Sequence, residues 1–295
     1  MSSPEKPLFT RRTSTVTTLG SDDEPDDENN TITSYTITTS SSSASWRPSS
    51  LSTKYHSWEP SNVARIITER HLDQKQQAKL ELFYAATRHI RHWKNGPYTA
   101  LQFLREWRWK VNAAVAAFER MIAWRLKHGV DGICDANNQD NYFEPHCDYN
   151  YFPQAILQGS DRQGNPIYVE RTGVTHLWEL LTRHGNDETV RASTWIREKC
   201  TTGEWVAKWE AATGRGLSGT TAIVDLQGLS RKHMAWQVMQ AVKTGTQIIQ
   251  ANWPCEANRV IIIRAPAIFR YVWSFLKPFC KCNDLGFWVW DCSSF

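Results

Sequence analysis

The stretch that decides the fold runs from Gly219 to Phe279 and reads GTTAIVDLQGLSRKHMAWQVMQAVKTGTQIIQANWPCEANRVIIIRAPAIFRYVWSFLKPF. Residues 221–226 form a short apolar run, and residues 260–263 form a second run of β-branched side chains. Between them, residues 232–250 carry apolar side chains at helical spacing. Two short buried strands joined by a helix predict a parallel βαβ unit with a right-handed crossover. The sequence therefore predicts the α/β class: a mostly parallel β-sheet flanked by helices.

This unit lacks the residue patterns of catalysis. Ser218 and Ser230 do not stand in the G-x-S-x-G setting of a nucleophile elbow. Asp225 ends a strand without a second carboxylate or a histidine placed to work with it, so capping of the turn is its predicted role. We therefore predict no catalytic residues, no metal site and no cofactor. An α/β enzyme is the least favoured alternative. The mostly apolar residues of the unit indicate instead that the protein holds a hydrophobic ligand.

A glycine pattern precedes the first strand. Residues 214–219 read GRGLSG and match the letters of a dinucleotide-binding loop. Such a loop follows a strand and opens a helix, so that the helix N-terminus meets the pyrophosphate. Here the order is helix, glycines, strand, and we predict a connector instead.

The composition divides the chain into parts. Residues 1–60 carry five Lys/Arg and eight Asp/Glu, with a Ser/Thr-rich stretch at 31–45, and we predict a disordered acidic tail. Residues 61–140 are predicted to be a helical module, with a helix broken at Asn95-Gly96-Pro97, a second at 98–107 and a third that begins near Val111. Gly129 is its predicted C-cap. Strands are expected at 155–157 and 166–170, around the turn Asp161-Arg-Gln-Gly164, and one long helix at 186–213.

Charge and cysteine content narrow the partners and the compartment. The chain has a net charge of +4, but residues 1–60 are negative and the residues after 60 carry +7. A basic folded part suits an anionic partner such as membrane headgroups or nucleic acid. Arg105, Arg108 and Lys110 alternate with Trp107 and Trp109, a mixture found at membrane interfaces, in nucleic-acid sites and at the rim of an ordinary core. The seven cysteines, without a signal peptide, indicate a reducing, cytoplasmic setting. No run is long enough to span a membrane, so membrane contact is expected to be peripheral.

Several segments, in their order and spacing, resemble the CRAL-TRIO family of lipid-transfer proteins. Those similar to its N-terminal helical module are YTALQFLR (98–105), WKV (109–111), WR (124–125) and GV (129–130). Those similar to its first strand pair are YFP (151–153), DRQGNPIY (161–168) and Glu170. Those similar to its central βαβ unit and the next helix are IVDLQGLS (223–230), ANWP (251–254), RAP (264–266) and WSFLKPF (273–279). The resemblance runs from about residue 75 to residue 279.

The resemblance implies a hydrophobic pocket that extracts one lipid from a bilayer, with the sheet as its floor and a movable C-terminal helix as its gate. Its best-known members exchange phosphatidylinositol and phosphatidylcholine. By position, Tyr168 and Thr220 map onto hydroxyls that bind phosphatidylcholine in the family. Arg108 keeps one charge of a basic pair that binds phosphoinositides, and Glu256 lies one place after the family's Tyr-Pro-Glu glutamate. These four residues are the predicted ligand-binding residues.

The end of the chain departs from the family. After Phe279 the family continues through a lysine, a strand and the gate helix, whereas residues 280–295 read CKCNDLGFWVWDCSSF. We read 141–279 as an incomplete lipid-binding domain, truncated before the gate helix, followed by an atypical tail at 280–295. Exposed Phe287, Trp288 and Trp290 would then favour aggregation.

These observations favour a lipid-binding and lipid-transfer protein that holds one phospholipid, with phosphatidylinositol as a candidate, or another hydrophobic ligand. It is expected to act as a monomer at an anionic membrane surface, without nucleic acid. The alternatives are a lipid-responsive adaptor without transfer activity and a truncated product without function.

Overall fold

The structure, a computed structural model, describes residues 57–135, 142–143, 154–202, 204–217, 219–255, 257–276 and 286–290. All of them belong to one compact unit, Ser40–Phe295. Almost all of the predicted acidic tail and most of the predicted C-terminal tail lie outside these residues, as do Cys280, Cys282 and Cys292.

The first four helices form the predicted helical module. They are α1 (Pro60–Glu69), α2 (Gln74–Thr87), α3 (Pro97–Glu106) and α4 (Val111–Lys127). The Asp73 side chain accepts a hydrogen bond from the Gln76 amide and completes a capping box at the start of α2. The rings of Phe83 and Phe103 each pack edge to face against Phe118 at a centroid distance of 5.6 Å, and all three belong to the module's core. Gly129 has the left-handed conformation (φ 58°) expected of a residue that ends a helix.

The second half forms a five-stranded sheet. Its strands lie in the order β1 (Gln154–Ser160), β2 (Pro166–Glu170), β3 (Thr220–Asp225), β4 (Ala257–Ile263) and β5 (Gly286–Trp290). The β1–β2 pair is antiparallel and the other three pairs are parallel. The predicted mostly parallel α/β fold is thus confirmed.

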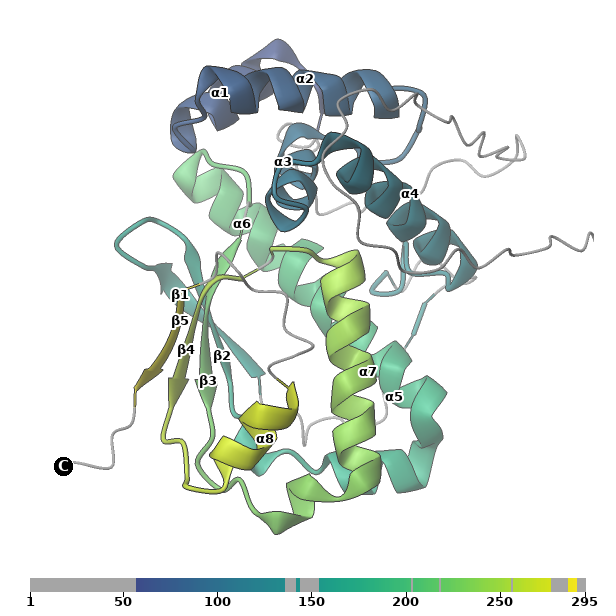
Figure 1. Cartoon of the computed structure of the whole chain (residues 1–295), viewed down its shortest axis with the longest axis vertical. Helices are drawn as coiled ribbons and strands as arrows, with labels where there is room; N and C mark the ends of the chain where they lie inside the picture. The colour runs from purple at the N-terminus through teal and green to yellow at the C-terminus, as the bar shows by residue number, and fades with distance from the viewer. Residues whose placement is uncertain are drawn as a thin grey trace, which may run out of the picture. The chain divides into compact units, whose positions relative to one another are not determined.

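The crossover helices share one side of the sheet. The connections contain η3 (Thr172–Val174), α5 (Leu177–Thr202), α6 (Glu204–Thr213), η4 (Arg231–Met234), α7 (Trp236–Asn252) and α8 (Phe269–Leu276). Because every parallel strand is added on the same side of its predecessor, right-handed crossovers place all their helices on one face. Figure 1 shows α5, α6, α7 and α8 on that face. There Tyr168 and Ala222 pack against Cys200 and Ile196 of α5.

Two elements differ from the sequence prediction. The predicted helix at 186–213 is two helices, and α5 already begins at Leu177, with a bend at Gly185 (φ 77°, ψ 177°). The predicted atypical tail contains β5, which pairs in parallel with β4. The edge of β4 supplies hydrogen-bond partners for the backbone N–H and C=O groups of this short segment, which it could not satisfy by itself.

The glycines before β3 have a packing role. A side-chain carbon on Gly216 would lie 2.7 Å from the ring of Tyr98 on α3, so only glycine fits there. The segment connects α6 to β3, which confirms the predicted connector.

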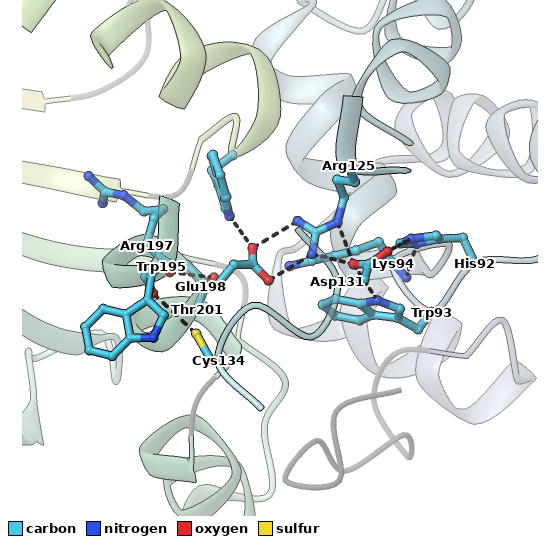
Figure 2. Close-up of polar contacts among 11 residues, drawn as sticks. His92, Trp93, Lys94, Arg125, Asp131, Cys134, Trp195, Arg197, Glu198 and Thr201 are labelled. Atoms are coloured by element: carbon cyan, nitrogen blue, oxygen red, sulfur yellow. Dashed lines mark hydrogen bonds and ion pairs between the residues drawn. The ribbon is translucent and has the colours of Figure 1, made fainter. Parts of the chain in front are cut away.

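A buried polar network joins α4 to α5 and to the end of α7 (Figure 2). Arg125 is fully buried, and its guanidinium donates hydrogen bonds of 2.9 and 2.8 Å to the two carboxylate oxygens of Glu198. It also donates bonds of 2.9 and 2.7 Å to Oδ1 of Asp131. Trp253 donates its indole N–H to Glu198 at 2.9 Å, and His92 Nε2 lies 2.7 Å from Asp131. Every charge in this group has a partner, as burial requires.

Candidate functional site

An open cavity of about 650 Å³ lies beyond the carboxyl ends of β3 and β4. Its lining comes from the segments that follow these two strands: η4 with its neighbourhood, and the start of α8. In Figure 1 both strands end beside α8. The cavity thus lies at the carboxyl edge of the sheet, the edge at which open α/β sheets carry their ligand sites. Its volume is in the range of small-ligand sites.

The lining combines apolar surface with two cations. Met234, Ala267 and Ile268 supply apolar atoms, whereas Arg231, Arg270 and Tyr271 supply polar ends. The Arg270 guanidinium lies over the Tyr271 ring at 4.7 Å and donates a hydrogen bond of 2.7 Å to its hydroxyl. A cavity with this lining suits an amphiphile with apolar chains and an anionic or polar head.

An ion pair holds the two strand ends that frame the cavity. Asp225, the last residue of β3, is 3% exposed, and Arg264, the first residue after β4, donates to both of its carboxylate oxygens. Asp225 Oδ1 also accepts a hydrogen bond of 3.0 Å from the Gln227 amide, which confirms its predicted turn-capping role. Arg264 has a left-handed backbone (φ 53°) and leads directly into the cavity-lining residues Ala267 and Ile268. The pair therefore ties the end of β3 to the start of the segment that lines the cavity.

Apolar side chains on the helix-covered face of the sheet and on α7 keep part of their surface open. On the helix-covered face, Val224 and Val260 are half-buried. On α7, Val242, Ile248 and Ile249 are half-buried as well. In a closed core, side chains of this kind would be almost fully buried.

The four predicted ligand-binding residues lie in three different settings. Tyr168 on β2 and Thr220 on β3 face the same helix-covered side of the sheet, and each is 5% exposed. Arg108 is exposed in the loop between α3 and α4, with a left-handed backbone (φ 50°). Glu256 lies outside the described residues. The structure thus brings Tyr168 and Thr220 to one face, and none of the three described residues lines the cavity at the strand ends.

Sequence reasoning missed Arg231 and Arg270. A signal was present, because residues 227–276 contain six Arg/Lys and the single acidic residue Glu256. A basic excess over a stretch that also forms the cavity marks a surface for an anion.

Other kinds of site find no support within the described part of the chain. There, no group of three His, Cys, Asp or Glu side chains is placed to hold a metal ion. None of the helices described is both long and apolar enough to span a bilayer.

Comparison with known proteins agrees with this architecture. Residues 154–283, which contain four strands of the sheet, α5 to α8 and the cavity, match the CRAL/TRIO domain. The chain is 28% identical over 213 residues to "Protein real-time" of Aedes aegypti, covering 70% of this chain and 31% of that protein. It is 28% identical over 221 residues to "Phosphatidylinositol/phosphatidylcholine transfer protein SFH9" of Arabidopsis thaliana, covering 73% of this chain and 37% of that protein.

The chain thus spans about a third of the length of these curated relatives. A solved structure, the crystal structure of Sfh5, aligns with a TM-score of 0.48 at 12% identity, over 79% of this chain and 82% of that one. At residues 154–283 the chain thus carries a match to the CRAL/TRIO domain, and this match covers β1 to β4, the crossover helices α5 to α8 and the cavity at the edge of the sheet.

Proposed function

We propose that this protein binds a single phospholipid, with phosphatidylinositol as the preferred headgroup, and transfers it between membranes without converting it chemically. The observation that carries the proposal is the cavity at the carboxyl edge of a CRAL/TRIO sheet, with apolar walls and two arginines. A relative whose name states phosphatidylinositol and phosphatidylcholine transfer supports the same ligand class.

The lipid chains would lie between the sheet and its helices. The half-buried Val224, Val260 and Val242 offer apolar contacts there. Each methylene group removed from water contributes about 0.8 kcal/mol, so a protein interior of this kind can compete with the bilayer for an acyl chain.

The headgroup would lie at the open end. The guanidinium groups of Arg231 and Arg270 can donate hydrogen bonds to a phosphate, and a charged donor strengthens such bonds. The Tyr168 and Thr220 hydroxyls are proposed to contact the ligand deeper in the fold, once it has displaced their present neighbours. Arg108 and Glu256 remain proposed ligand contacts.

Transfer of fluorescent phospholipid between donor and acceptor vesicles tests the proposal. The full chain is expected to accelerate transfer of labelled phosphatidylinositol, and labelled phosphatidylcholine more weakly. Ala267→Trp, which fills the cavity mouth, should abolish the acceleration, whereas Ala212→Trp, at an exposed position of α6, should preserve it. A full chain that leaves both transfer rates at the protein-free value would overturn the proposal.

A further inference from the structure

The rim of the cavity carries exposed basic and aromatic side chains together. We use the name rim for Arg231, Lys232, Trp236, Arg270 and Tyr271. Trp236 is 68% exposed and Tyr271 is 52% exposed, and both belong to the few large apolar side chains that solvent reaches in the described part of the chain. Arg231, Arg270 and Tyr271 line the cavity, and Lys232 and Trp236 belong to the same η4–α7 segment.

The basic side chains of the rim have few competing acids. Arg231 and Lys232 are exposed, and no ion pair involving either occurs among the described residues. Arg270 contacts Tyr271 through its guanidinium. Only one acidic residue, Glu256, occurs between positions 227 and 276. The positive charge of the rim is therefore available to an external anionic surface.

We propose that the rim is the surface on which the protein docks to an anionic bilayer, with Trp236 and Tyr271 at headgroup level and the cavity mouth facing the lipids. This inference rests on the proposed function, because it explains how a lipid passes between bilayer and cavity. Trp and Tyr are favoured at the membrane interface, and each nearby Lys or Arg adds attraction to anionic lipids. Charge complementarity thus selects an anionic membrane as the occupant.

Co-sedimentation with vesicles tests the docking surface. The full chain is mixed with phosphatidylcholine vesicles that contain, or lack, about 30 mol% phosphatidylserine, enough to give the surface a negative potential. Paired Arg231→Ala and Lys232→Ala substitutions should weaken binding to the anionic vesicles about 25-fold, since each charge is worth about fivefold. Trp236→Ala should weaken it about tenfold, and this loss should persist at high salt, unlike the loss of charge.

The matched control is Arg120→Ala with Lys127→Ala, which removes the same two charges from exposed positions of α4. It should bind the anionic vesicles as the unchanged protein does. Equal binding by the rim variant and this control would overturn the docking surface, and so would equal binding of the unchanged protein to neutral and anionic vesicles.

A second measurement separates docking from lipid binding. A short-chain fluorescent phospholipid is offered in solution, without vesicles, and its uptake is followed by fluorescence polarisation. Lys232→Ala with Trp236→Ala should keep uptake while vesicle binding falls. Uptake with no vesicle binding by the unchanged protein would overturn docking and leave the proposed function standing. Vesicle binding through the rim with no uptake would overturn the proposed function alone.

Discussion

Arg125 on α4 and Glu198 on α5 form a two-pronged ion pair across 73 residues of sequence, with both side chains buried. The pair connects the helical module to the first crossover helix of the CRAL/TRIO domain. Trp253, which directly follows α7, donates to the same Glu198, so this one carboxylate on α5 contacts both α4 and the end of α7. This arrangement predicts that the two halves of the described unit unfold together.

Removal of one partner of the Arg125–Glu198 pair should therefore lower the free energy of unfolding. Arg125→Met leaves the buried Glu198 and the half-buried Asp131 without their main donor, and breaking a buried pair costs about 3–5 kcal/mol. Chemical unfolding of the full chain should show this loss of unfolding free energy with a single transition. Arg120→Met, at an exposed position of the same helix, should change the free energy by less than about 0.5 kcal/mol. A loss below about 1 kcal/mol in Arg125→Met would show that the network does not hold the halves together.

The same network predicts loss of stability in acid. Burial alone raises the pKa of Asp131, but the charge of Arg125 and the hydrogen bonds from His92 and Arg125 outweigh it and hold the pKa well below its usual value. For Glu198 too, burial is outweighed by the charges of Arg125 and Lys94, and the pKa is lowered. Carboxylates with lowered pKa values stabilise the fold above their unfolded pKa values, near 4. Their contribution is lost as the pH falls from about 5.

Urea unfolding at a series of pH values from 7 to 3 measures this dependence. Asp131→Asn should lower the stability at pH 7 and flatten its fall in acid, because one of the two titrating groups is gone. Parallel curves for the variant and the unchanged protein would contradict the assignment of the acid sensitivity to this site.

Arg264 allows backbone strain and ion pairing to be separated. The backbone of Arg264 has a φ of 53°, a conformation that glycine adopts at little cost in free energy and that is unfavourable for other residues. Arg264→Ala and Arg264→Gly both remove the ion pair with Asp225, but only glycine relieves the backbone. Arg264→Gly should therefore be the more stable variant by about 1 kcal/mol in thermal unfolding. The reverse order would show that the left-handed conformation is absent in solution.

Cys134 should be a poor nucleophile. Burial, with the charge of Glu198, raises the pKa of its thiol to about 12, and its sulfur donates a hydrogen bond to the Trp195 carbonyl at 3.4 Å. Only the thiolate form of a cysteine reacts with iodoacetamide, and a raised pKa keeps that form scarce. At pH 8, iodoacetamide should therefore alkylate Cys134 far more slowly in the folded protein than in urea. Peptide mass spectrometry measures both rates, and equal rates would contradict the burial of this thiol.

The central strands could be predicted from sequence because their signal is local. The β-branched run at 260–263 and the run at 221–226 coincide with β4 and β3 to within a few residues. The end of α4 followed from Gly129 in the same way. The start of α5 was missed because Gly185 looks like a helix boundary, whereas the chain bends there and continues.

The parts that were missed depend on distant partners. Arg125 has the position of a basic residue in the last turn of a helix, and nothing near it in the sequence names Glu198 as its partner. Strand β5 needs the edge of β4, which exists only in the folded sheet. The cavity with Arg231 and Arg270 forms beyond the ends of two strands, which come together only in the folded sheet. The sequence alone shows only the excess of basic residues around these two arginines.

Native mass spectrometry of the full chain, purified from eukaryotic cells under mild conditions, tests the central claim most directly. The account predicts a complex whose mass exceeds that of the 34.0 kDa chain by one lipid, and extraction should identify that lipid as a phospholipid. Ala267→Trp should reduce this complex, whereas Ala212→Trp should not. A chain that carries no lipid from cells and takes up none from added phospholipid would contradict the account.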